Sequence, residues 1–220
     1  MGASSFSILS VNVGLPKVIG VAGGEPVLSG IAKHPVCGAQ VMVRTAAIDG
    51  DGQADLENHG GADKAVYVYP AVHWSWWESE HRLPCRPATF GENLTLENGD
   101  ERDVAIGDRF RWGEVLLEIS QPRMPCFKLA MHARSDVPHV MTVSGRCGWY
   151  MRVITEGEAP VPRSALIRVA PGEGPSVRDS FVTVVSSQPD PATLHRIHET
   201  PALSAAWRRA VARKIAALAG

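Results

Sequence analysis

Hydrophobic and polar residues alternate over short stretches through most of the first 185 residues. These stretches are rich in β-branched and aromatic residues and are separated by turn residues, which is typical of half-buried strands. The 21 Gly and 16 Pro interrupt the chain at many points. We therefore predict an α+β, mainly β fold: a twisted sheet or partly closed β-barrel with few helices before residue 186. The predicted strands are residues 7–13, 40–44, 65–69, 108–112, 115–120, 150–154, 165–169 and 181–185.

Helical periodicity appears first after Pro70. Proline suits the first turn of a helix, and Trp74, Trp77 and His81 then fall on one face at spacings of three and four. We expect the tryptophans of this helix to lie in the core.

A second helical pattern begins at Gln188. Pro189 and Pro191 suit a first turn, and Pro201 precedes another run with a regular apolar face. We therefore divide the chain into a β-barrel-like domain, residues 1–175, and a C-terminal helical module, residues 176–220. The packing face of the last helix is predicted to be Leu203, Trp207, Ala210, Val211, Ile215 and Leu218, with a solvated face at Arg208, Arg209, Arg213 and Lys214.

Composition limits the class of protein. Of 220 residues, 45% are hydrophobic and 20% charged, with a formal net charge of −1, which is ordinary for a globular protein. Because this charge balance gives no excess of cations, we expect neither a nucleic-acid polymer nor a membrane as partner. A small polar ligand fits better. The first ten residues lack a signal-peptide pattern, so we expect a cytoplasmic protein.

The segment from Gln121 to Lys128 combines a thiol with cations and stiff backbone. Cys126 lies between Arg123 and Lys128, and the two prolines of this segment restrict the backbone. Nearby cations favour the thiolate, which is the nucleophilic and metal-binding form of cysteine. The alternative is that Cys126 is a small buried hydrophobic residue. Cys37, Cys85 and Cys147 form no Cys-x-x-Cys pair with it or with each other.

A glycine-rich segment contains His59, Gly60, Gly61 and Lys64. Two glycines allow backbone to approach a ligand closely, and the lysine suits an anion. The segment lacks the Gly-x-x-x-x-Gly-Lys-Ser/Thr pattern, so it gives little support to nucleoside triphosphate binding. The alternative is a loop corner with a hydrogen-bonded imidazole.

A second polar cluster follows Gly91. Glu92 can act as a general acid or base when partly desolvated, and Asn93 can orient a polar ligand. A β-turn in which Asn93 makes local hydrogen bonds would have the same sequence.

Taken in order, these motifs resemble the molybdenum cofactor sulfurase C-terminal (MOSC) domain family, and in particular its stand-alone, YiiM-like bacterial branch. The resemblance covers about residues 5–170 and also uses Ile106-Gly107-Asp108. It implies a barrel-like domain that binds a molybdopterin-type molybdenum cofactor, with Cys126 as molybdenum ligand or sulfur carrier. The helical tail looks like the three-helix module of that branch, although residues 188–220 are few for three helices, so one is abbreviated or begins earlier.

The resemblance also implies an activity, the reduction of N-hydroxylated small molecules to amines. Cys126, His59 and Glu92 are then the predicted catalytic residues, and His59 and Glu92 would hydrogen-bond the cofactor or deliver protons. The predicted cofactor-binding residues are Gly60, Gly61, Lys64, Asn93, Arg123 and Lys128. Electrons would come from a separate reductase, and a homodimer is the preferred oligomeric state.

Two other functions remain open from the sequence. Cys126 could carry a persulfide, or hand cofactor to another protein, without turning over a substrate. It could also be the nucleophile of a cysteine hydrolase with His59 as base.

Overall fold

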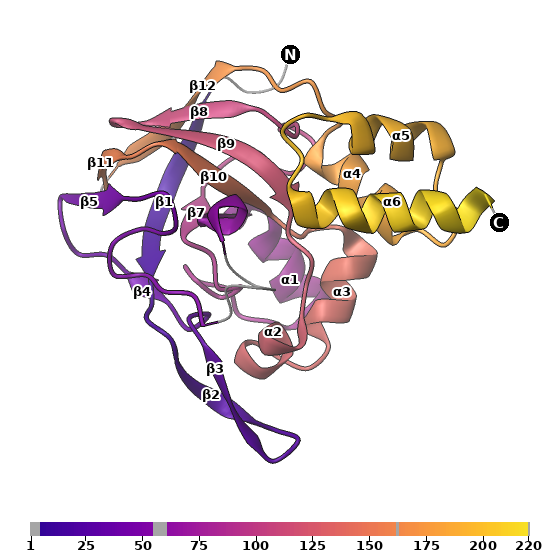
Figure 1. Cartoon of the computed structure of the whole chain (residues 1–220). Coiled ribbons are helices and arrows are strands. Elements are labelled where there is room, and N and C mark those ends of the chain that lie inside the picture. The colour runs from indigo at the N-terminus through magenta and orange to yellow at the C-terminus, as the bar shows by residue number, and fades with distance from the viewer. Residues whose placement is uncertain (1–4, 55–60, 162, 220) are drawn as a thin grey trace.

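A computed structural model describes residues 5–54, 61–161 and 163–219. Within these ranges a seven-stranded barrel carries helices at its ends and side (Figure 1). The strands are β1 (Ser5–Val13), β2 (Lys17–Ala22), β3 (Glu25–Ser29), β4 (His34–Pro35), β5 (Gln40–Val43), β6 (Val66–Pro70), β7 (Leu94–Leu96), β8 (Arg109–Trp112), β9 (Val115–Pro122), β10 (Trp149–Thr155), β11 (Gly157–Pro160) and β12 (Ser164–Ala170). The helices are η1 (Ala62–Lys64), η2 (Ala71–His73), α1 (Trp74–His81), α2 (Phe127–His132), α3 (Val137–Ser144), α4 (Val177–Val185), α5 (Pro191–Glu199) and α6 (Ala205–Ala219).

The barrel closes because its first and last strands pair with each other. The order is β12, β8, β9, β10, β6, β7 and β1, and β1 then pairs with β12 through registers such as Phe6 opposite Leu166. Neighbouring strands are antiparallel except β6 and β7, which are parallel. The predicted α+β fold and barrel are confirmed, and among the described strands the barrel is closed rather than partly open.

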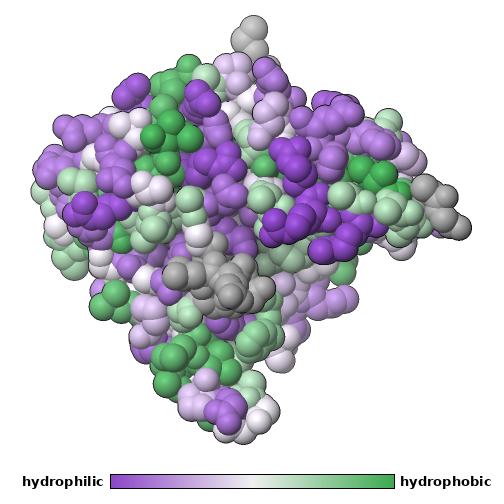
Figure 2. All heavy atoms as spheres, in the orientation of Figure 1, coloured by the Kyte–Doolittle hydropathy of each residue, from purple (hydrophilic) through white to green (hydrophobic). Residues whose placement is uncertain are grey.

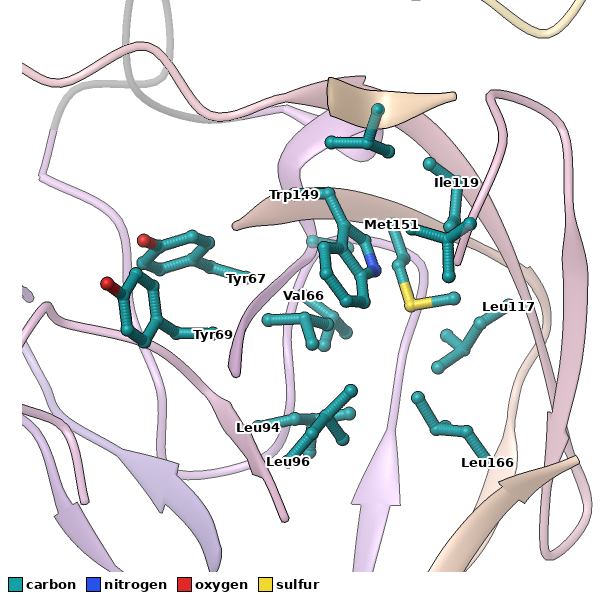
Figure 3. Close-up of a cluster of buried hydrophobic side chains, with 14 of the residues drawn as sticks. Val66, Tyr67, Tyr69, Leu94, Leu96, Leu117, Ile119, Trp149, Met151 and Leu166 are labelled. Carbon is teal, nitrogen blue, oxygen red and sulfur yellow. The ribbon is translucent and has the colours of Figure 1, made fainter. Parts of the chain in front are cut away.

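Alternation along each strand fills the barrel. In β8, Phe110 and Trp112 are buried while Arg109 and Arg111 are exposed, as the period of two requires. Figure 3 shows the core that results, with side chains from β6, β7, β9, β10 and β12 pointing toward one another. Seven of the eight predicted strands agree with β1, β5, β6, β8, β9, β10 and β12 to within two residues at each end.

The predicted strand at residues 181–185 is wrong, because these residues belong to helix α4. Its β-branched residues resemble a strand, but Val177, Ser180 and Phe181 are buried on one helical face. The hydroxyl of Ser176 caps the helix by accepting a hydrogen bond from the Asp179 N–H at 2.9 Å. Since α2, α3 and α4 all precede residue 186, helices are also more common there than predicted.

The helix predicted after Pro70 is confirmed as η2 and α1. Trp77 is fully buried, and its Nε1 donates to the hydroxyl of Tyr69 at 2.6 Å. Trp74 and His81 are only half-buried.

The helices α4, α5 and α6 provide the three-helix tail, and the earlier start at Val177 explains its apparent shortness. Leu203, Trp207 and Val211 are buried, as predicted, whereas Leu218 is exposed. These helices lie together beside the barrel, where α4 packs on β9 (Figure 1). The division at residue 175 stays a prediction.

The predicted solvated face of α6 is partly wrong. Arg209 and Arg213 are exposed, but Arg208 donates to the carbonyls of His198 and, at 2.8 Å, Thr200 at the end of α5. Lys214 similarly donates to the carbonyl of Val184 at 2.6 Å at the end of α4. Because cations stabilise the carbonyl ends of helices, these two side chains join α6 to its neighbours.

The strands β2 and β3 form a hairpin that projects from the barrel (Figure 1). Val18, Val21 and Leu28 are exposed on it, and Figure 2 shows hydrophobic surface there. In the described ranges, none of the helices has the length and apolar character needed to cross a bilayer.

Candidate functional site

One cavity gathers most of the residues that the sequence motifs singled out. Its volume is about 100 Å³, and its walls come from the loops after β3, β5 and β9, from the loop before β7, from η1 and α2, and from β6 and β10. The predicted site residues that line it are Lys64, Asn93, Arg123, Cys126 and Lys128.

Cys126 lies in the segment that joins strand β9 to helix α2. Its backbone is extended, with φ −134° and ψ 170°, and its carbonyl accepts the N–H of Leu129 at 3.0 Å. The residue is half-buried. Cys126 therefore forms part of the cavity wall and is not enclosed in the hydrophobic core.

Arg123 is a buried cation beside this thiol. Its side chain is held over the ring of Tyr67, 5.0 Å from the centroid, and its Nη1 lies 3.4 Å from the sulfur of Met141. Burial disfavours the charged form, but Tyr67, Tyr150 and Cys126 outweigh burial and raise the pKa of the guanidinium above its usual value. The cavity thus contains a permanent positive charge.

A buried ion pair that the sequence did not suggest also lines the cavity. Lys33 bonds to Asp51 through its Nζ, and their side chains are only 8% and 3% exposed. Asp51 also accepts the N–H of Gly14 at 2.9 Å. Burial lowers the pKa of Lys33, although the charge and hydrogen bond of Asp51 act in the opposite direction. Lys33 is therefore an ammonium group that gives up its proton more readily than an exposed lysine.

Asn93 holds this ion pair in place. Its Nδ2 donates to Asp51 Oδ2 at 2.9 Å and to the carbonyl of Asn12 at 3.2 Å, and its Oδ1 accepts the N–H of Tyr67 at 3.0 Å. The amide is thus hydrogen-bonded at both ends within the protein. Its predicted contact with a cofactor stays a prediction, while its structural contacts are extensive.

Glu92 does not line the cavity. The side chain is fully buried and accepts hydrogen bonds from the N–H groups of Ala88, at 2.8 Å, and Phe90, at 3.0 Å, and from the hydroxyl of Thr95 at 2.8 Å. Burial raises the pKa of Glu92 against the opposing effect of these hydrogen bonds. The arrangement supports the 88–92 turn, and proton delivery by Glu92 stays a prediction.

The glycine-rich motif is only partly described. His59 and Gly60 lie outside the described residues. Gly61 has φ +89°, which favours glycine, and a Cβ there would meet no atom within 4 Å. The side chain of Gln53 accepts the N–H of Gly61 and donates to the carbonyl of Lys64, each at 3.0 Å. Gln53, which belongs to the same glycine-rich segment but had no predicted role, fixes the turn that carries Lys64 into the cavity wall.

The same turn is attached to the helical tail. Asp63, next to Lys64 in η1, pairs with Arg152 at 2.8 Å, and its carbonyl accepts the hydroxyl of Ser120 at 2.6 Å. Its other carboxylate oxygen accepts the N–H of Ala205, the first residue of α6, at 3.4 Å. The position of Lys64 thus depends on contacts from the barrel and from α6.

The arrangement brings a soft sulfur donor, a buried guanidinium and three lysines, Lys33, Lys64 and Lys128, to one cavity. Asp51 is the one carboxylate among the lining residues that the structure describes. Thiolates bind soft metals, and cations bind anionic groups. The described residues contain no cluster of three or more His, Cys, Asp or Glu side chains that could hold a metal ion.

Comparisons with known proteins agree with these motifs. Residues 55–173 match the family model of the MOSC domain. A Bacillus subtilis (strain 168) protein named Uncharacterized protein YflK is 39% identical over 216 residues, covering 97% of this chain and 96% of the relative. The crystal structure of YiiM from Geobacillus stearothermophilus is similar with a TM-score of 0.79 and 34% identity, covering 96% of this chain and 99% of that one.

A longer fungal protein matches part of its length. A protein named Reductase from Gibberella moniliformis (strain M3125 / FGSC 7600) is 35% identical in an alignment of 182 positions that covers 74% of this chain. This segment is only 31% of the length of the fungal protein.

Proposed function

This chain belongs to the MOSC domain family, and from that membership we propose that it binds a molybdenum cofactor and reduces N-hydroxylated small molecules to amines. The observation that carries the proposal is the position of Cys126 in a cavity wall beside the buried cation Arg123. The family is associated with this cofactor, and a related protein is named Reductase.

The residues present fit such a cofactor by their chemistry. Cys126 supplies a soft ligand for molybdenum, and Arg123, Lys64 and Lys128 supply positive charge for the anionic groups of its pterin carrier. The cavity volume of about 100 Å³ is smaller than that of common ligand pockets, which are roughly 300 to 1,000 Å³. The cavity would therefore hold only part of such a cofactor.

The chain itself contributes ligation, charge and protons. When bound, the cofactor supplies the two-electron redox chemistry. Conversion of N–OH to N–H also consumes two protons and releases water. Lys33 lines the same cavity as Cys126, and burial lowers the pKa of its ammonium group, so it can donate one of these protons. The charge of Asp51 acts in the opposite direction and favours reprotonation of Lys33. His59 keeps its predicted role in proton delivery as part of the proposal.

Electrons come from a separate protein in this proposal. The support is the fungal relative, in which a segment like this chain is joined to additional sequence in a protein named Reductase. We propose that the present chain receives its electrons from a partner protein. We also propose that it can act as a homodimer.

Metal content tests the proposal most directly. Wild-type protein from cells that make the cofactor should contain close to stoichiometric molybdenum and, with a chemical reductant, should reduce an N-hydroxylated base. Cys126→Ser should lose both, whereas Cys37→Ser, which removes an exposed thiol that does not line the cavity, should lose neither. A Cys126→Ser protein that keeps metal and activity would refute the assignment. A persulfide on Cys126 in molybdenum-free wild-type protein would indicate the sulfur-carrier function.

A further inference from the structure

A second cavity, separate from the one that contains Cys126, is rich in arginine. Its volume is about 240 Å³, and its walls come from η2, the loop after β7, the loop after α3 and the start of α4. Its ionisable lining residues are His73, Asp100, Glu101, Arg102, Arg146 and Arg178.

The acidic side chains of this cavity are already paired. Asp100 forms an ion pair with Arg102 at 3.1 Å. Glu101 bonds to His73 at 2.8 Å through one oxygen and accepts the N–H of Gly148 at 2.7 Å through the other. The carboxylates of Asp100 and Glu101 are therefore already bound to other groups. Among the described residues, the positive charges of Arg146 and Arg178 have no carboxylate partner.

Arg146 is held in place by stacking. Its guanidinium lies over the ring of Trp76, 3.9 Å from the centroid, in α1. Among the residues described, its side chain has no hydrogen-bond acceptor. Stacking fixes the plane of a guanidinium while leaving its N–H groups available, which suits two-pronged binding of a carboxylate or phosphate.

Arg178 occupies space that a glycine provides. Its Nη1 donates to the carbonyl of Ser144 at the end of α3. Gly145 has φ +65°, and a Cβ at this position would lie 2.1 Å from Arg178 Nη1. A residue with a side chain would displace the guanidinium, so the glycine leaves room for it beside Arg146.

The geometry points to a binding site for a small oxyanion, the phosphate or carboxylate group of a metabolite, between Arg146 and Arg178. The cavity is large enough for one such group, and the two guanidinium groups provide uncompensated charge and donors. The site does not depend on the proposed reductase function. It is also connected to Arg123 of the first cavity, because Gly148 donates to Glu101 and accepts the N–H of Arg123 at 3.2 Å.

Isothermal titration calorimetry with inorganic phosphate and with succinate tests the site. We expect millimolar or tighter binding of at least one of them, weakened at least tenfold in Arg146→Ala. Whichever of the two binds more tightly shows whether the site prefers a phosphate or a carboxylate group. Arg213→Ala removes an exposed arginine of α6 and should bind as wild type does. Because Arg178 has a structural hydrogen bond, Arg178→Lys is the second variant, and weaker binding is expected there as well.

The first cavity is also cationic, so Lys128→Ala serves as the control for binding there. Binding lost in Lys128→Ala but intact in Arg146→Ala would overturn the inference, as would the absence of binding for both anions. Circular dichroism of each variant ensures that lost binding does not reflect unfolding. Since the titration needs no molybdenum, its failure is distinguishable from failure of the proposed reductase function.

Discussion

The side chain of Asn93 donates a hydrogen bond to the carboxylate of Asp51 at 2.9 Å, and Asp51 in turn binds the buried ammonium of Lys33. A residue that the sequence marked for ligand binding thus positions an ion pair that the sequence did not reveal. This contact fixes the position of a negative charge in the cavity wall, because Asp51 is the one carboxylate among the described lining residues.

Asn93→Asp should destabilise the protein. The change replaces the donating amide NH₂ of residue 93 by a second carboxylate beside Asp51. Loss of the hydrogen bonds and repulsion between the two charges should lower the free energy of unfolding by on the order of 3 kcal/mol. Urea unfolding measures this cost, and the loss should shrink below about pH 4, where carboxyl groups are protonated. Gln188→Glu makes the same chemical change at an exposed position and should have little effect. Equal stabilities of the two variants would contradict this account of Asn93.

Glu92→Ala should reduce stability by roughly 3 kcal/mol, because it leaves the N–H groups of Ala88 and Phe90 without their acceptor. Glu92→Gln keeps one acceptor oxygen and should lose less. Thermal unfolding and N-hydroxyl reduction should be measured on both. If Glu92→Ala were as stable as wild type but inactive, Glu92 would be a proton donor rather than a support for the turn.

Glu101 should make stability depend on pH in the acid range. Burial acts to raise its pKa, but the hydrogen bond and charge of His73 and the N–H of Gly148 outweigh burial, so the pKa lies below its ordinary value of 4.5. A carboxyl with a lowered pKa contributes stability above its unfolded pKa, and this stability is lost as the pH falls through the folded pKa. Glu101→Gln should therefore be less stable than wild type at pH 7, and the difference in Tm should diminish below pH 4.5. A difference that is constant from pH 7 to pH 3 would refute this linkage.

Arg208→Ala should loosen the helical tail. Its guanidinium donates to carbonyls at the end of α5, and losing these charged hydrogen bonds should cost about 2 kcal/mol. For a chain of this size, Tm should then fall by roughly 4–8 °C. The neighbouring Arg209 is exposed, so Arg209→Ala is the matched control and should leave Tm almost unchanged. If calorimetry gave both variants the same Tm, the contacts of Arg208 with the end of α5 would not contribute to stability.

The barrel was predictable because its pattern is local. Burial of Phe110 and Trp112 between exposed arginines is visible in the sequence as simple alternation. The error at residues 181–185 has a physical reason, since β-branched residues also fill the buried face of a helix. The cap formed by Ser176 and Asp179 was the available signal for a helix there.

The candidate site was predictable only in part. Arg123, Cys126 and Lys128 are neighbours in one segment, so their chemistry could be read together. Lys33 and Asp51 are 18 residues apart, and no pattern in the sequence links the two, so only the folded barrel brings them into contact. Gln53 is similar, because its role is to hold the turn at Gly61 rather than to bind a ligand.

The three-residue helix η1 has one further implication for work with shortened chains. The carboxylate of Asp63 accepts a backbone hydrogen bond from the start of α6, while the adjacent Lys64 lines the candidate cavity. Deleting the tail would therefore remove an anchor from the wall of that cavity. Truncated proteins should be judged by their metal occupancy as well as by their solubility.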